Sequence, residues 1–162
     1  SDKLKIHCIR PATVCGLSAR MRLDVSVNLL TFQALRNKKI TVFGGLQTRP
    51  NIHIKDMANI YLHFLNNPDL ENGFYNSGFE NISILDIAKL IQSKIDCDIE
   101  IKESNDPRSY RLDSSKLINT GFKPNYKINN AIDEIIEAYD NDLLIDKDEW
   151  HTVKWMKQLN IK

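Results

Sequence analysis

The sequence predicts an α/β protein in which short strands alternate with amphipathic helices. Two observations predict this class. Apolar residues recur at helical spacing in several separate stretches, and short apolar or alternating segments lie between them. The chain has 162 residues, of which 42% are hydrophobic and 27% charged. That composition is typical of one globular domain or a large part of one. The strands are too few and too short for a complete doubly wound domain.

The first predicted strand covers residues 4–9, where apolar and polar side chains alternate until Pro11 is reached. A loop follows, and helical spacing then predicts a helix over residues 23–36. Residues 40–43 form a short strand, which Gly44 ends. The N-terminal quarter therefore predicts one strand–helix–strand succession.

The middle of the chain continues the alternation. A polar loop is expected over residues 46–51 and an extended segment over residues 52–54. Asp56 is then expected to cap or charge the first turn of a helix that runs to Leu65. Residues 73–76 predict another strand. Ser83 is then expected to cap the next helix, with an acidic residue three positions later as in a capping box.

The C-terminal part adds one more strand and several helices. The predicted elements are a strand at 99–102, a polar loop at 103–112, a short helix at 114–119, a long helix capped by Asn129 or Asn130, and a helical tail at 144–162.

Charge and hydropathy exclude several classes of protein. The 22 Lys and Arg against 21 Asp and Glu give a net charge of +1, which argues against nucleic-acid binding and against a polybasic membrane anchor. No stretch approaches the roughly 18 apolar residues of a membrane span, and residues 1–5 do not begin a signal peptide. Cys8, Cys15 and Cys97 lack metal-ligand spacing. We therefore expect free thiols, no metal site and a cytoplasmic location.

Loop arginines are the residues most suited to binding an anion. Arg49 and Arg108 lie in two predicted loops, and Arg111 follows closely. A guanidinium makes bidentate contacts with phosphate oxygens, so two such loops that converge would hold a diphosphate. The alternative is that these side chains simply face water. The sequence has neither GxGxxG nor GxSxG, and its histidines are scattered.

Four segments, in order, resemble the extended short-chain dehydrogenases, which include the NAD-dependent nucleotide-sugar epimerases and dehydratases. They match, in turn, the family patterns RPxxVYG, ixvfGxGxqxRdfxhVxDva, YNxGxxxxxs and dpRxyrxDxsKxxxxLGfxP. The segments are Ile9–Gly16, Ile40–Ala58, Phe74–Ile84 and Asp106–Pro124. The resemblance covers residues 4 to about 140.

The family's N-terminal half binds NAD(P) through a glycine-rich turn and supplies a catalytic Tyr-x-x-x-Lys pair. Neither motif occurs here, and the fourth residue after each tyrosine is not lysine. The tyrosines and these following residues are Tyr61 and Leu65, Tyr75 and Phe79, Tyr110 and Ser114, Tyr126 and Asn130, and Tyr139 and Leu143. The resemblance thus implies that residues 1–162 are a substrate-binding C-terminal region, with the strand at 4–9 belonging to the Rossmann sheet of an N-terminal half.

The resemblance also implies roles for particular residues, with no catalytic residue among them. Pro11, Ala12 and Val14 correspond to the segment that lines the nicotinamide. The residues implied in substrate binding are Asn28 at the phosphate, Val42 and Phe43 as an apolar ledge for the base, and Arg49 with Arg108 at the diphosphate, with Arg111 as the alternative second arginine.

The resulting hypothesis is a nucleoside-diphosphate-sugar-binding region of an NAD(P)-dependent epimerase or dehydratase (an isomerase or lyase) that is not catalytic alone. The alternative is a non-catalytic nucleotide-sugar-binding module, or one chain of a split enzyme that pairs with a separate Rossmann subunit. A truncated fragment is a third possibility. NAD or NADP is expected in the intact enzyme and none in this chain alone. The expected partners are the nucleotide sugar, the N-terminal half and a possible second copy, with no nucleic acid and no membrane.

Overall fold

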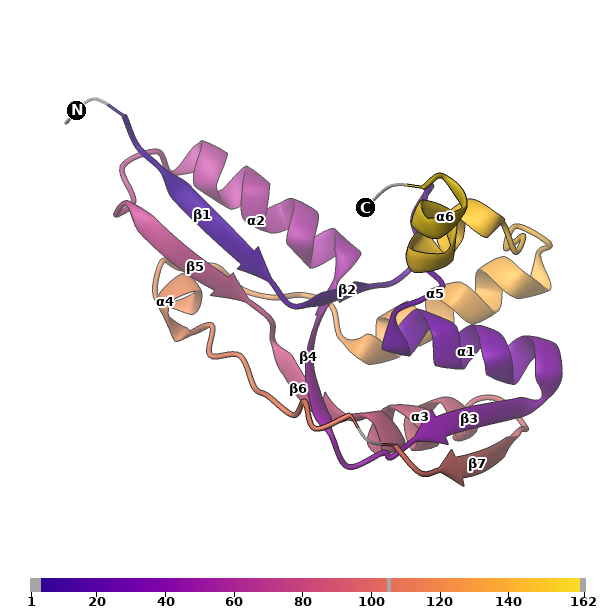
Figure 1. Cartoon of the computed structure of the whole chain (residues 1–162). Helices are drawn as coiled ribbons and strands as arrows, with labels where there is room; N and C mark the ends of the chain where they lie inside the picture. Colours follow the sequence, from indigo (N-terminus) through magenta and orange to yellow (C-terminus); the bar gives the residue numbers. More distant parts are fainter. Residues whose placement is uncertain (1–3, 105, 161–162) are drawn as a thin grey trace.

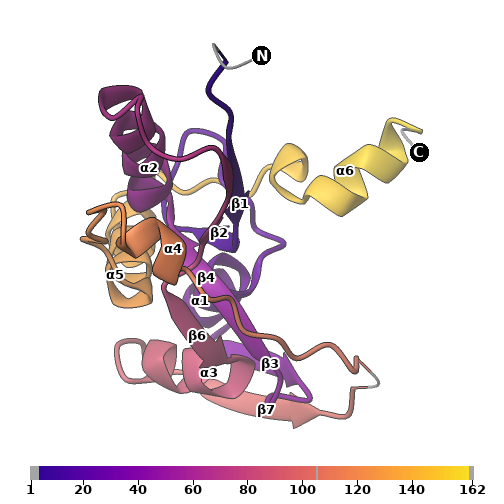
Figure 2. The same cartoon turned by 90° about the vertical axis from the view of Figure 1, so that its left-hand side faces the viewer.

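The computed structural model describes residues 4–104 and 106–160, and it has the α/β fold that the sequence predicts (Figure 1). Its strands form three small sheets rather than one continuous sheet. The sheet that contains β1 lies at one end of the molecule and the sheet that contains β3 at the other, with β4 running between them (Figure 2). The architecture is therefore a central strand with a small α/β unit at each end.

The two end sheets are parallel pairs. At one end β1 (His7–Pro11) pairs with β5 (Gly73–Ser77). At the other end β3 (Lys39–Phe43) pairs with β7 (Asp98–Lys102). A parallel pair needs a crossover connection, and here each pair is connected through helices.

The central sheet has the order β2, β4, β6. Strand β2 (Thr13–Cys15) is parallel to β4 (Thr48–His53), and β6 (Glu80–Ser83) is antiparallel to it. Strand β2 follows β1 after one residue, so the central sheet is joined directly to one end sheet.

Helices flank these sheets. They are α1 (Ser26–Asn37), α2 (Ile54–Asn66), α3 (Ile84–Gln92), α4 (Ser115–Ile118), α5 (Ile128–Asp140), the 3₁₀ helix η1 (Asp148–Trp150) and α6 (Thr152–Gln158).

Two hydrophobic clusters stabilise the arrangement. The larger packs α1, α3 and α5 with β3 and includes the fully buried Ile40, Ile87 and Ile132. The smaller packs α2 with β5 and includes Ile60 and Tyr75. Because each fully buried aliphatic side chain contributes about 1.5–3 kcal/mol, the helices are fixed by their apolar faces.

The first strand lies later in the chain than predicted. It spans His7–Pro11 rather than residues 4–9, and the parallel ladder is continued by the Ala12 N–H, which donates to the Ser77 carbonyl at 2.9 Å. Proline is tolerated because, among the described residues, β1 pairs only with β5 and has an open edge.

The loop predicted over residues 46–51 is confirmed at residues 46 and 47 and was wrong from residue 48, whereas the extended segment predicted from residue 52 forms the end of a strand. Strand β4 runs from Thr48 through Pro50 to His53, and strand β6, which the sequence did not predict, pairs with its first half. Proline is accommodated because β2 pairs with β4 only from Asn51 onward, so one side of Pro50 needs no ladder partner.

Two helix starts also differ from prediction. Helix α1 begins at Ser26 rather than at residue 23, because Leu23 is fully buried in the loop before it and its N–H donates to the Trp150 carbonyl at 2.8 Å. Helix α2 is capped by His53, whose Nδ1 accepts from the Lys55 N–H at 3.1 Å. Asp56 is therefore not the cap, but it does lie in the first turn, as the other alternative predicted.

The long C-terminal helix is capped by Lys127, not by Asn129 or Asn130, although the Asn130 carboxamide oxygen accepts from the Lys127 N–H at 2.8 Å. The strands at 40–43, 73–76 and 99–102 are confirmed to within one residue, as is the Ser83 cap, whose hydroxyl accepts from the Asp86 N–H at 3.0 Å. The predicted tail contains η1 and α6, and its residues 161 and 162 lie outside the described residues, as do residues 1–3 of the predicted region.

Candidate anion-binding site

Two of the predicted arginines lie together. Arg49, near the start of β4, and Arg108, in the loop after β7, both bind the Asp106 carboxylate. Arg49 reaches it through one terminal nitrogen at 3.1 Å, and Arg108 through Nε and Nη2 at 2.7 and 2.8 Å. Arg49 also donates to the Arg108 carbonyl and to the Thr48 carbonyl. Two guanidiniums therefore converge on one anion.

The chain around this cluster fixes its position. The Thr48 N–H donates to the Ser109 hydroxyl at 3.0 Å, and the Tyr110 N–H donates to the Thr48 carbonyl at 3.3 Å. The Arg49 guanidinium lies 5.5 Å from the centre of the Tyr110 ring, which favours a cation. The loop that carries Arg108 is thus held against the start of β4.

The two arginines differ in exposure, and this decides how each could bind a ligand. The Arg49 side chain is 14% exposed, whereas that of Arg108 is 75% exposed. Arg49 is therefore the fixed member of the pair and Arg108 the one free to reorient. Arg111, the alternative second arginine, is exposed three residues further along the loop, while the ion pairs of Asp106 are made by Arg49 and Arg108.

Asp106 is a strong acid in this setting. Hydrogen bonds from the Arg108 side chain and backbone, followed by the charge of Arg49, hold the pKa of the Asp106 carboxyl well below its usual range. The carboxylate is therefore ionised at neutral pH. Chemically, it occupies the place that another anion, such as a phosphate, would take between two guanidiniums.

The two residues predicted to form an apolar ledge for the nucleotide base differ in burial. Val42 is fully buried in the larger core, whereas Phe43, the next residue on β3, is 56% exposed. Successive side chains on a strand point to opposite faces, so only one of the two can touch a ligand. Of this pair, Phe43 is available.

The segment predicted to line the nicotinamide joins β1 to β2. Pro11 is exposed, while Ala12 and Val14 are half-buried. A β-carbon added to Gly78 would lie 2.6 Å from that of Ala12, so the chain after β5 packs tightly against this link. Tight packing fixes the direction in which β2 leaves β1.

Asn28 has a different environment from the one predicted. It is buried on α1, its carboxamide oxygen accepts from the Gly16 N–H at 3.0 Å, and its amide nitrogen donates to the Arg22 carbonyl at 2.9 Å. Both polar ends of the side chain are therefore bonded to the loop that follows β2. In this structure Asn28 holds a loop, and a direct bond to a phosphate would require one of these bonds to break.

That loop borders a pocket of about 250 Å³. Its walls come from β2 and the residues after it, from α1 and from the start of α2. The lining residues are Val14, Cys15, Gly16, Ser18, Arg20, Arg22, Asn28, Ile54 and Met57. Sequence reasoning missed Arg20 and Arg22, which lie four and six residues after the first family-like segment.

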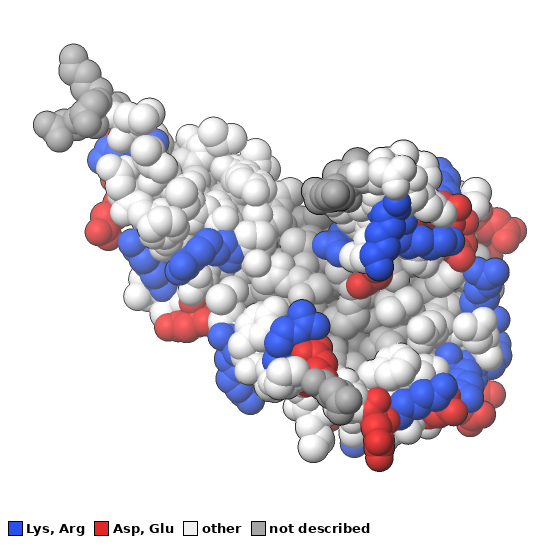
Figure 3. Space-filling view, viewed as in Figure 1, with Lys and Arg blue, Asp and Glu red and all other residues white. Residues whose placement is uncertain are grey.

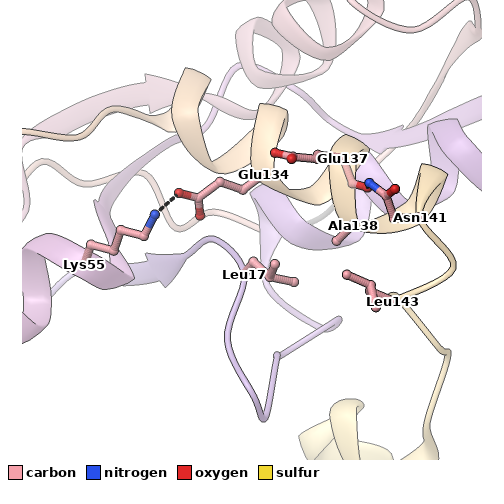
Figure 4. Close-up of a pocket in the computed structure, with 7 residues that line it drawn as sticks. All are labelled: Leu17, Lys55, Glu134, Glu137, Ala138, Asn141 and Leu143. Atoms are coloured by element: carbon pink, nitrogen blue, oxygen red, sulfur yellow. Dashed lines mark hydrogen bonds and ion pairs between the residues drawn. The ribbon is translucent and has the colours of Figure 1, made fainter.

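A second pocket, of about 330 Å³, lies between α5 and the start of α2 (Figure 4). The Lys55 ammonium and the Glu134 carboxylate are 2.5 Å apart at its edge, and Glu137 and Asn141 lie further along α5. Lys55 and Glu134 neutralise each other, which leaves the Glu137 carboxylate as the charge that this pocket presents, so the pocket does not suit an anion.

A buried histidine lies behind the Lys55–Glu134 pair. His53 stacks on Tyr126 with ring centres 4.8 Å apart, and its Nε2 lies 3.3 Å from the Glu134 carboxylate. Burial lowers the pKa of His53, with Glu134 opposing and Lys55 adding to the shift. The neighbouring Cys15 thiol is buried as well, which raises its pKa to about 12 and makes it an inert packing group.

Residues 4–104 and 106–160 contain no group of three or more His, Cys, Asp or Glu side chains placed to hold a metal ion. This part of the chain also has no helix that is long and apolar enough to cross a bilayer.

Comparisons with known proteins agree with the family resemblance. Residues 1–78 match the model of the NAD dependent epimerase/dehydratase family. Anthocyanidin reductase from Arabidopsis thaliana is 29% identical over 152 residues, which cover 89% of this chain and 44% of that protein.

Solved structures give the same relationship. The UDP-glucuronic acid 4-epimerase from Bacillus cereus, in complex with UDP-glucuronic acid and NAD, is 26% identical with a TM-score of 0.69, over 84% of this chain and 45% of that one. The UDP-N-acetylglucosamine 4-epimerase from the same organism is 21% identical with a TM-score of 0.72, over 90% and 49%. The chain thus spans less than half the length of these relatives and shares the fold of that part.

Proposed function

From the relationship of this chain to the NAD-dependent epimerase/dehydratase family, we propose that it is the part of such an enzyme that binds the nucleoside diphosphate of a nucleotide sugar. The observation that carries the proposal is the convergence of Arg49 and Arg108 on the Asp106 carboxylate. A diphosphate would replace Asp106 and take up the same hydrogen-bond donors.

Of the remaining predicted residues, Phe43 and the link between β1 and β2 support this role, whereas Val42 is buried and the Asn28 amide is already bonded. Phe43 is exposed at the end of β3, so it is available to a base. Val14 lies on β2, which pairs with β4, the strand that carries Arg49. We propose that Pro11, Ala12 and Val14 face the nicotinamide of an NAD(P) bound in the intact enzyme, where the cofactor supplies the hydride chemistry.

In this proposal the chain positions the substrate and does not carry out the redox step. The sequence has no Tyr-x-x-x-Lys pair, and positioning alone does not supply a hydride acceptor. Epimerase or dehydratase activity is therefore a property that we assign to an assembly with an N-terminal Rossmann half.

A second candidate has an observation of its own. Strand β1 has an open edge among the described residues, and the apolar side chains of Leu4 and Ile6 just before it are exposed. An open parallel edge favours pairing with a further strand. One chain of a split enzyme, or a binding module that joins a separate Rossmann subunit, would use this edge. NAD-dependent turnover that appears only on mixing with an N-terminal half would support it.

The test of the main proposal is calorimetric titration of the chain with UDP and with dTDP. We expect binding of at least one nucleotide, and a loss of about tenfold or more in affinity in Arg49→Ala and in Arg108→Ala, because each removes a charge-assisted contact. The control is Arg36→Ala. Arg36 lies in the last turn of α1 and pairs with Asp146, so the variant removes an arginine that is not part of the proposed site. Normal binding by both variants would show that the site lies elsewhere.

A further inference from the structure

We propose that the pocket after β2 is a carboxylate-binding subsite, in which Arg20 and Arg22 recognise an acidic group on the sugar. The proposal rests on the proposed function, from which it takes the nucleotide sugar as the ligand. It adds that this sugar carries a carboxylate, a property on which the two arginines at Asp106 give no information.

The charged side chains around the pocket indicate that it suits an anion. Two guanidiniums line it, and the carboxylate that binds one of them is Asp24, 2.9 Å from the Arg22 Nε. Asp24 compensates the charge of Arg22, so the positive charge that this pocket offers comes from Arg20, which is bonded to a backbone carbonyl, while Glu80 and Glu134 act on the Cys15 side of the pocket. Burial raises the pKa of Asp24, but the hydrogen bond and charge of Arg22 act the other way and the pKa is lowered overall. Asp24 is therefore ionised at neutral pH.

The loop that carries the arginines is held in place from two sides. On one side, the Asn28 amide binds both the Gly16 N–H and the Arg22 carbonyl. On the other, the Arg20 Nη2 donates to the Glu149 carbonyl at 3.2 Å. A site whose donors are fixed before binding loses less entropy when a ligand arrives. This anchoring gives the buried Asn28 a positioning role.

The C-terminal tail supplies the second anchor. The Leu23 N–H donates to the Trp150 carbonyl at 2.8 Å, the Trp150 ring is buried, and the Val153 N–H donates to the Asp24 carboxylate at 3.3 Å. The tail thus touches the arginine loop at both Leu23 and Asp24. A segment outside the family-matched residues 1–78 therefore shapes this pocket.

The position of the pocket fits the sugar rather than the diphosphate. Arg49 lies four residues before His53 on β4, and Cys15 pairs with His53, so the pocket is roughly 13 Å along the strand from Arg49 at about 3.3 Å per residue. A hexose joined to a diphosphate covers a comparable length. Figure 3 shows the surface hollowed between the part with β1 and α2 and the part with α1 and α6, with Lys and Arg side chains at its borders.

The walls of the pocket also match a sugar acid. Its lining includes the apolar side chains of Val14, Ile54 and Met57 together with the Ser18 hydroxyl and the guanidiniums. A volume of about 250 Å³ admits one hexose ring. Apolar contacts for the ring face and a charged contact for one substituent give an orientation as well as affinity.

The first experiment compares UDP-glucuronate with UDP-glucose by calorimetry, or the dTDP counterparts if the chain prefers dTDP. We expect the acidic sugar to bind at least about tenfold more tightly, because it adds a charge-assisted contact. Arg20→Ala and Arg22→Ala should reduce that preference and leave UDP affinity unchanged, whereas Arg36→Ala should keep it. Equal affinity for the two sugars would overturn the subsite but not the diphosphate site.

The second experiment needs no nucleotide, and so it remains decisive if the proposed function fails. Methyl β-glucuronide and methyl β-glucoside are titrated separately at millimolar concentration, and the amide signals of Gly16 and Ser18 are followed by NMR. We expect shifts with the acid alone and their loss in Arg22→Ala. Equal responses to both sugars, or no response to either, would contradict the proposal.

Discussion

At the scale of single residues, the function of a polar side chain here depends on what already holds it. The Arg108 side chain is exposed and binds Asp106 of its own loop, so it can exchange that carboxylate for a ligand without breaking a contact to another element. Asn28 is buried with both ends of its amide engaged. The family resemblance implied contact with phosphate for both residues, but their surroundings differ, because the Arg108 side chain is exposed and the Asn28 side chain is buried.

His53 makes stability depend on pH. Burial lowers the pKa of His53 in the folded chain below the ordinary value of 6.5. As pH falls through 6.5, the unfolded chain therefore takes up a proton at His53 before the folded chain does. Stability is therefore full above that value and is lost as pH falls from about 7 toward the lower, folded pKa. The slope is at most about 1.4 kcal/mol per pH unit for one proton.

His53→Asn tests this, because asparagine keeps a side-chain acceptor for the Lys55 N–H and does not titrate. Urea unfolding at a series of pH values from 5 to 8 should show a flatter dependence in the variant than in the wild type. His151→Asn, at a half-buried histidine of the tail, serves as the control. Identical pH profiles for the wild type and His53→Asn would exclude His53 as the source.

At the scale of elements, Asp56 joins α2 to the chain that precedes α5. It is fully buried, and its carboxylate accepts from the N–H groups of Asn125 and Tyr126 at 2.9–3.1 Å. A carboxylate in the first turn of a helix reads as a cap in the sequence. Its actual partners are about 70 residues away, a distance over which local patterns carry no information.

Replacing this carboxylate should therefore cost more than a lost cap. We expect Asp56→Asn to lower the free energy of unfolding by about 2 kcal/mol, since it weakens buried charge-assisted bonds to two backbone donors. Asp133→Asn removes an exposed ion pair with Lys94 and should change stability by no more than about 0.5 kcal/mol. Chemical denaturation measures both, and equal effects would mean that Asp56 does not join the two elements.

The strands show where local reading succeeds and fails. The strand around Ile40 and the strand from Gly73 have apolar or aromatic residues and clear turn signals, and both were predicted. Strand β4 contains Pro50, so its first half has no strand-like pattern. Strand β6 has four residues, most of them polar, and has no such pattern either. Their pairing with each other, which only the folded chain brings about, is what makes them strands.

At the scale of the whole molecule, motifs in the sequence indicated a resemblance to a family and singled out two arginines, but they did not show how the arginines meet. Arg49 and Arg108 are 59 residues apart, and they converge because the loop after β7 returns to the start of β4. Arg20 and Arg22 were missed for the same reason, since their pocket is completed by α1, α2 and the anchoring tail. The sites of this chain are products of long-range pairing between small sheets.

The central claim is that a nucleoside diphosphate takes the place of the Asp106 carboxylate between two arginines. Calorimetric titration of UDP and dTDP into Asp106→Asn tests it most directly, with Asp113→Asn, an exposed carboxylate of the same loop, as the control for lost negative charge. Because the competing anion is removed, we expect Asp106→Asn to bind about three- to fivefold more tightly than the wild type, and Asp113→Asn to bind like the wild type. Unchanged or weaker binding by Asp106→Asn would contradict the account.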